Sequence, residues 1–175
     1  VLRSGRKNKF WNENWYYSWM KKIILIIVVL LSNLSIGQEN KAFIGKWEVL
    51  EVYNNDYYYK VKNDSIVLSE KMQKLYKGRV SLQDYKASIR GDNKYVIFEF
   101  KNENEFYYFL SKKAIYPTFK GTFEILNDLI ILDVTNMANI KLKKEASFYF
   151  SDNKLHITMH LETNTPTSYI LEKSN

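Results

Sequence analysis

His156 and His160 are the only histidines in the chain, and histidine is the side chain best suited to metal binding or acid–base catalysis near neutral pH. On a helix, two histidines at this spacing would converge on one metal ion. The residues around them alternate between apolar and polar, however, which is typical of a strand. At about 3.3 Å per residue the two rings then lie about 13 Å apart, too far to share an ion. We therefore predict no metal site and no cofactor, and we expect both histidines on an outer face, beside Tyr149 and Glu145.

Other catalytic side chains are present without the spacing that catalysis requires. A hydrolase triad would need a histidine beside a strained serine turn such as Gly-x-Ser-x-Gly, and the chain offers no such arrangement. Carboxylates such as Glu99, Glu103 and Glu105 are scattered, and nothing singles out the pair that a glycosidase needs. The chain has no glycine-rich phosphate loop and no cysteine, which excludes thiolate chemistry. The sequence therefore predicts a protein that is not an enzyme, without catalytic residues.

The net charge of +7 is concentrated in the first part of the chain. Six basic residues and one acidic residue precede Gln38, whereas 20 basic and 18 acidic residues follow from there on. The larger part of the chain thus has interspersed charges of both signs, as on an ordinary solvated surface. This distribution argues against nucleic acid as a partner.

Residues 20–37 have the layout of a secretory signal peptide. Met20 is followed by two lysines, then by the apolar run Ile23–Leu31, and then by small residues at alternate positions ending at Gly37. The run is shorter than the roughly 20 residues of a membrane span, although an uncleaved anchor is the alternative. We expect cleavage between Gly37 and Gln38, transient membrane contact only, and a secreted or periplasmic protein.

Residues 1–19 precede this signal and do not begin with Met. We interpret them as an upstream over-extension of the reading frame, with a long basic region of the signal as the alternative. Residues 38–175 then form one domain, which is long enough to bury a core without disulfides.

The pattern of residues 38–175 predicts an all-β fold. Aromatic and β-branched residues alternate with polar ones in short runs separated by Asn, Asp and Gly. A helix is expected over 68–78, ended by Gly78. The expected strands are 46–53, 57–61, 95–101, 105–110, 119–126, 129–134, 144–151, 154–162 and 168–173.

Two hairpins have a register that can be derived from the sequence. Two-residue turns at Asn127-Asp128 and Asp152-Asn153 would place apolar partners on one face and polar partners on the other. A slip of one residue would expose every apolar side chain, so the register is well specified. The expected inner pairs are Ile125–Ile130, Phe123–Leu132, Gly121–Val134, Phe150–Leu155, Phe148–Ile157 and Ala146–Met159, and the expected outer pairs include Tyr149–His156.

Successive antiparallel hairpins leave exposed edges unless the sheet closes on itself. About eight strands can close into an up-and-down barrel, with room for side chains or for one small ligand. An outer-membrane barrel is disfavoured, because the strands are short and Lys120, Glu145 and Lys154 would face lipid.

Gly45-Lys46-Trp47, followed by an alternating strand, resembles the start of a lipocalin. From Phe43 to Lys173 the chain resembles small bacterial secreted proteins called lipocalin-like, in the Gly121–Ile125 hairpin and the final Tyr169–Lys173 strand as well. The resemblance implies an antiparallel eight-stranded barrel in which Trp47 closes one end. The lipocalin arginine that stacks on this tryptophan is absent, and Lys173 is the residue that would take its place.

Aromatic side chains are the remaining candidates for a functional site, because they could bind a ligand or a partner. We predict that a small, mainly apolar ligand binds within the barrel of a monomer. The expected lining residues are Trp47, Phe98, Phe100, Phe123, Phe148 and Phe150. The alternative is a barrel whose interior is filled by these rings and which acts structurally or through surface tyrosines, such as Tyr57–Tyr59, on a protein or glycan.

Overall fold

The computed structural model describes residues 18–27, 41–77, 81–160 and 165–174. The chain divides into two units, Val1–Phe43 and Ile44–Asn175. In the first unit, residues 18–27 form a helix that contains the start of the apolar run. The expected cleavage site, Gly37 and Gln38, lies outside the described residues, so the export signal stays a prediction. None of the described helices has the length and apolar character needed to cross a membrane.

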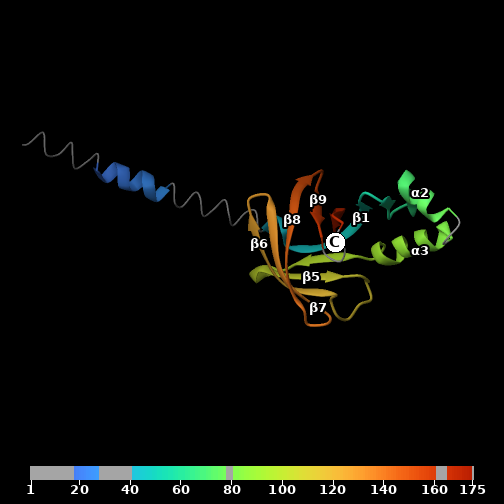
Figure 1. Cartoon of the computed structure of the whole chain (residues 1–175). Helices are drawn as coiled ribbons and strands as arrows, with labels where there is room; N and C mark the ends of the chain where they lie inside the picture. Colours follow the sequence, from blue (N-terminus) through green and yellow to red (C-terminus); the bar gives the residue numbers. More distant parts are fainter. Residues whose placement is uncertain (1–17, 28–40, 78–80, 161–164, 175) are drawn as a thin grey trace, which may run out of the picture. The chain divides into compact units, whose positions relative to one another are not determined.

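Eight strands of the second unit close into an antiparallel barrel (Figure 1), which confirms the predicted fold. Each strand pairs with the next one along the barrel, and the last strand returns to pair with the first. In order around the barrel they are β1 (Gly45–Tyr53), β4 (Ile97–Phe100), β5 (Glu105–Phe109), β6 (Phe119–Leu126), β7 (Leu129–Asn136), β8 (Lys141–Ser151), β9 (Lys154–Met159) and β10 (Thr167–Lys173).

The β6–β7 and β8–β9 hairpins have the register derived from the sequence. Phe123 pairs with Leu132 in the first hairpin, and Phe148 pairs with Ile157 in the second. Asp152 and Asn153 both have positive φ angles, 51° and 59°, as a type I′ turn requires. The alternating pattern therefore specified the register of both hairpins correctly.

A segment between β1 and β4, residues 54–96, projects from one end of the barrel (Figure 1) and is called the insert below. It contains β2 (Tyr57–Lys60), β3 (Ser65–Leu68), α2 (Glu70–Tyr76) and α3 (Leu82–Asn93). A 3-10 turn (Asn102–Asn104) lies outside the insert, between β4 and β5. The first half of β1 pairs with β4 and the second half with β2, so β1 belongs to both parts. The insert has its own small core, made of Tyr59, Leu68, Met72 and Ile89.

The insert is where the sequence prediction was incomplete. The helix expected over 68–78 is α2, which begins after the cap residue Ser69 and ends at Tyr76, while Gly78 lies outside the described residues. Strand β3 was not predicted, and neither was α3. Helix α3 is mostly polar, but it does begin with a recognisable cap, because the Ser81 hydroxyl accepts a hydrogen bond from the Asp84 N–H at 3.1 Å.

Trp47 closes the end of the barrel away from the insert. Its side chain is 3% exposed, and the Lys173 ammonium lies 5.6 Å from the centre of its ring. Gly45 makes room for this lysine, because a Cβ there would lie 2.6 Å from Lys173 Cε and its φ of +134° disfavours other residues. Lys173 therefore contacts Trp47 in the way expected of the substitute for the lipocalin arginine.

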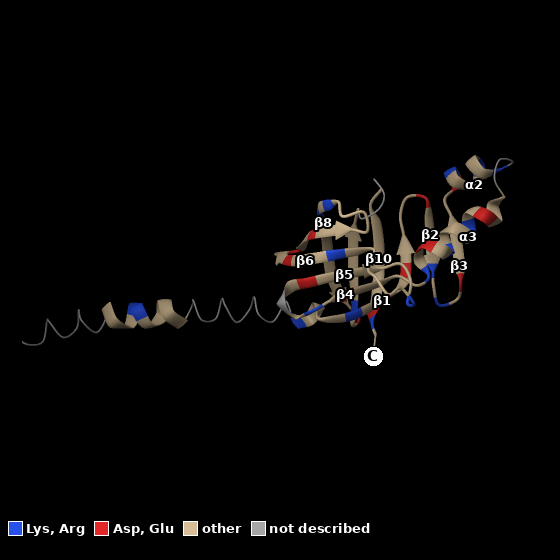
Figure 2. Cartoon of the chain, turned by 90° about the horizontal axis from the view of Figure 1, so that it is seen from below, with Lys and Arg blue, Asp and Glu red and all other residues tan. Residues whose placement is uncertain are grey.

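Basic and acidic residues are interspersed along the strands of the barrel, as Figure 2 shows. Lys46 of β1 forms an ion pair with Glu99 of β4, and Glu48 of β1 forms one with Lys112 in the loop after β5. Such exposed pairs each contribute at most about 1 kcal/mol to stability, so the barrel is stabilised mainly by its apolar interior.

Candidate functional site

The phenylalanines expected to line a ligand cavity pack against one another in the barrel interior. Phe98, Phe100 and Phe123 are at most 2% exposed. The rings of Phe100 and Phe123 meet edge to face, with centroids 5.0 Å apart, and Phe98 meets Tyr108 and Tyr169 in the same way at 5.1 and 5.2 Å. Edge-to-face contacts at these distances are those of a packed aromatic core.

Phe148 and Phe150 lie at the closed end of the barrel. Their rings are 6.2 Å apart, and the Phe150 ring lies 6.1 Å from that of Trp47. Phe150 pairs with Leu155 as predicted, but it is 41% exposed and does not reach the interior. The reason is that the end of β8 pairs with β9 but extends past the last β7 pair, Leu129 with Ser147, so Phe150 lies at the end of the barrel.

A cavity of about 240 Å³ lies at the other end of the barrel, between its rim and the insert. We call it the mouth cavity. The barrel contributes hydroxyl and aromatic groups from β5 and from the start of β10, and the insert contributes the β1–β2 turn and one face of α3. Its lining residues are Asn54, Asp56, Tyr57, Tyr85, Ser88, Ile89, Asp92, Asn93, Tyr108, Thr165, Thr167 and Tyr169.

Two other surface hollows are larger but less enclosed. One, of about 470 Å³, lies beside the β2–β3 hairpin, and the other, of about 550 Å³, lies beside the end of β10. None of the six residues predicted to line a ligand site borders any of these three spaces. The mouth cavity is the best enclosed of the three, so it is the candidate functional site.

The β1–β2 turn holds one wall of the mouth cavity through Asn54. The Asn54 side-chain oxygen accepts hydrogen bonds from the N–H groups of Asp56 and Tyr57 at 2.9 and 3.1 Å. The Asn54 N–H in turn donates to the Tyr57 carbonyl at 3.0 Å. This side-chain-capped turn fixes where Asp56 leaves the backbone.

Helix α3 holds the opposite wall, and Asn93 connects it to β2. Asn93 is 6% exposed, and its amide donates to the Ile89 carbonyl at 2.8 Å and to the Tyr57 hydroxyl at 3.2 Å. One turn earlier, the Ser88 hydroxyl donates to the Asp92 carboxylate at 3.2 Å. Asp92 and Tyr57 are therefore positioned by side chains of the same helix.

The two insert tyrosines of the mouth cavity remain protonated at neutral pH. Burial raises the pKa of Tyr85 to about 12, and the nearby Asp56 carboxylate acts in the same direction. Burial also raises the pKa of Tyr57, opposed by the hydrogen bond from Asn93 and assisted by the charges of Asp92 and Asp56. Both hydroxyls can therefore donate hydrogen bonds to a ligand in the cavity, whereas the carboxylates of Asp56 and Asp92 can only accept them.

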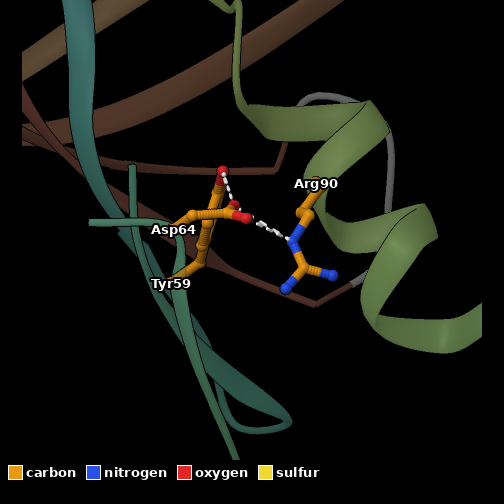
Figure 3. Close-up of polar contacts among 3 residues, drawn as sticks. All are labelled: Tyr59, Asp64 and Arg90. Carbon is orange, nitrogen blue, oxygen red and sulfur yellow. Dashed lines mark hydrogen bonds and ion pairs between the residues drawn. The ribbon is translucent and has the colours of Figure 1, made fainter. Parts of the chain in front are cut away.

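An ion pair fastens α3 to the β2–β3 hairpin (Figure 3). Asp64, whose φ of 52° lies in the left-handed region, accepts hydrogen bonds from Arg90 Nε at 2.9 and 3.0 Å and from the Tyr59 hydroxyl at 3.1 Å. We call these three residues the Asp64 latch. Partial desolvation opposes ionisation of Asp64, but the hydrogen bonds from Arg90 and Tyr59 outweigh it and lower the pKa of the carboxyl. The latch therefore holds in place the helix that forms one wall of the mouth cavity.

Replacing Asp64 with Asn is expected to lower the stability of the protein at pH 7 but not in acid. A carboxyl whose pKa is lowered by folding stabilises the folded state above its ordinary pKa, and this contribution is lost as the pH falls below about 4 towards the folded-state pKa. Urea unfolding of Asp64→Asn and of the unchanged chain, compared between pH 7 and pH 2.5, measures the difference. Arg90→Gln should have the same effect, and the two changes together should cost little more than one; additive losses would show that the two side chains are not coupled.

The strand pattern predicts the position of His156 correctly, but β9 ends at Met159, before His160 can pair with Glu145. His156 pairs with Tyr149 across β8 and β9, and the two rings stack with centroids 4.3 Å apart. His160 is exposed, just past the end of β9. In the part of the chain that the structure describes, no three His, Cys, Asp or Glu side chains come close enough to hold a metal ion.

Sequence reasoning missed the mouth cavity, although it singled out Tyr57 as part of an aromatic run. The reason is that α3 was not predicted, and this helix supplies Tyr85, Ser88, Asp92 and Asn93 to the lining. The Ser81 cap followed by Asp84 was the available signal for this helix. Comparison of the chain with models of known families and with curated proteins gives no match.

Proposed function

We propose that the chain is an exported, monomeric, lipocalin-like binding protein that performs no catalysis and holds a small ligand in the mouth cavity. The observation that carries this proposal is an enclosed space at the barrel rim, lined by hydrogen-bonding side chains from the rim and from the insert. Export rests on the signal-like pattern of residues 20–37, and the absence of catalysis rests on the spacing of the chemically active residues.

The mouth cavity is a better candidate for a ligand site than the barrel interior. The barrel interior is occupied by Phe98, Phe100 and Phe123, which contact other rings. At about 240 Å³ the cavity is slightly below the usual range for ligand pockets of about 300–1,000 Å³, which favours a small ligand. Its many hydroxyl, amide and carboxylate groups favour a ligand with polar groups, in place of the mainly apolar ligand expected from the sequence.

A surface function is the second candidate, and it is supported by apolar side chains on two loops of the barrel. Ile115 and Tyr116, in the loop after β5, are 86% and 76% exposed, and Met137, in the loop after β7, is 73% exposed. These loops adjoin one another because Phe119 pairs with Asn136. A protein or glycan that contacts them would use the barrel as a structural support, with no ligand in the mouth cavity.

Filling the mouth cavity should abolish ligand binding. Ser88 lines the cavity and Ala87, its neighbour on α3, does not, so Ser88→Trp should occlude the space while Ala87→Trp should leave it open. Both positions are exposed, which allows the larger side chain without disturbing the core. We expect native mass spectrometry of protein isolated from its producing host to show a bound small molecule with the unchanged chain and with Ala87→Trp, but not with Ser88→Trp.

Two results would contradict this proposal. Repeated recovery of the unchanged protein without any bound molecule would favour the surface function. Retention of the molecule by Ser88→Trp would place the binding site elsewhere in the protein.

A further inference from the structure

The mouth cavity has charges of one sign only. Asp56 and Asp92 line it from the β1–β2 turn and from α3, and none of the twelve described lining residues is Lys or Arg. Within the described part of the chain neither aspartate forms an ion pair, whereas Asp64 of the same insert is neutralised by Arg90. The mouth cavity therefore holds two carboxylates whose charge no basic side chain of its lining balances.

The aromatic lining adds to this preference for positive charge. Tyr57, Tyr85, Tyr108 and Tyr169 all border the cavity. The face of an aromatic ring attracts a cation, and the attraction is stronger where water is excluded. Because the pKa values of Tyr57 and Tyr85 are raised, their hydroxyls stay neutral and add no competing charge.

We propose that the ligand of the mouth cavity is a small organic amine, whose ammonium group lies between Asp56 and Asp92 and against the tyrosine rings. This inference rests on the proposed function and specifies its ligand class. An anionic ligand would meet two like charges, and a neutral one would leave both carboxylates unbalanced. A bound calcium ion would need six to eight oxygen ligands, and two carboxylates are a small part of such a site.

Three probes that differ only in their charged group test the inference. Phenethylamine is a cation at pH 7, 2-phenylethanol is neutral and phenylacetate is an anion, while the ring and chain stay the same. We expect isothermal titration calorimetry with the full chain to show phenethylamine binding at least about tenfold more tightly than the alcohol, as one charge-assisted contact implies. Phenylacetate should not bind measurably.

Variants of the two aspartates locate the contact. Asp56→Asn and Asp92→Asn keep the shape of each side chain and remove its charge, so each should weaken phenethylamine binding by about tenfold. Asp128→Asn is the matched control, because this exposed aspartate lies in the β6–β7 turn away from the mouth cavity. Its affinity for phenethylamine should equal that of the unchanged chain.

The outcomes separate the ligand class from the proposed site. If the alcohol binds as tightly as the amine and Ser88→Trp blocks both, the mouth cavity binds ligands but the amine inference fails. Tighter binding of phenylacetate, equal affinities of Asp128→Asn and the two cavity variants, or no binding of any probe would also overturn the inference. The proposed function itself is decided separately, by the molecule that the protein carries from its host.

Discussion

Replacing Gly121 with alanine is expected to lower the free energy of unfolding by about 3 kcal/mol, the upper part of the usual range for overpacking. A Cβ at this position would lie 2.0 Å from the Asp133 carbonyl oxygen and 2.7 Å from Val134 Cα. Both are backbone atoms of β7, so no side-chain rotation can relieve the clash. Because domains of this size are stable by only about 5–15 kcal/mol, the loss is a large fraction of the total.

Gly91→Ala is the matched control for this prediction. Gly91 lies in α3, and no atom outside its own helix lies within 4 Å of a Cβ built there. The same substitution should therefore raise stability by about 0.5–1 kcal/mol, the difference between glycine and alanine in a helix. Urea unfolding followed by circular dichroism measures both changes. A Gly121→Ala variant as stable as the unchanged chain would show that β6 and β7 can separate at this point without cost.

The Gly121–Val134 pair illustrates what could be derived from the sequence. Alternation over β6 and β7 fixed which side chains share a face, and the two-residue turn then fixed the register. The same reasoning gave the β8–β9 hairpin. The contact between Lys173 and Trp47 was expected only from the resemblance of Gly45-Lys46-Trp47 to the start of a lipocalin. Both hairpins depend on residues close in sequence and on a two-residue period.

The insert could not be derived in the same way, because its elements have weak local signals. Helix α3 places only Leu82, Tyr85 and Ile89 as large apolar residues along its length, so its apolar face is short. It is held by contacts between distant residues, such as Arg90 with Asp64 and Asn93 with Tyr57. Contacts of this kind depend on the tertiary fold and leave no period in the sequence.

The candidate site shifted for a related reason. The sequence shows that Phe98, Phe100 and Phe123 face inward, but whether inward rings line a space or fill it depends on how strands of the barrel converge. The rings of Phe98, Phe100 and Phe123 contact other aromatic rings at centroid distances of 5.0–5.2 Å. The mouth cavity lies where the insert meets the barrel rim. Predicting it would have required knowing how β1, β2 and α3 are arranged.

Phe98→Ala tests whether the aromatic interior of the barrel supports ligand binding in the mouth cavity. Phe98 is fully buried, and its ring supports Tyr108 and Tyr169, which border the mouth cavity. Removing the ring should lower the free energy of unfolding by about 3–5 kcal/mol, as for other buried phenylalanines. It should also weaken phenethylamine binding, because the two tyrosines lose the group that holds them in place.

Phe123→Ala separates the two effects. Phe123 is 2% exposed and contacts Phe100 in the interior, but it does not border the mouth cavity. Its truncation should cost a similar amount of stability in urea unfolding while leaving the dissociation constant of phenethylamine unchanged. Equal losses of affinity in both variants would mean that binding depends on overall stability and not on the support of Tyr108 and Tyr169. Benzene should raise the melting temperature of Phe98→Ala but not of the unchanged chain, because an apolar void of this kind binds an apolar molecule and a packed interior has no room for one.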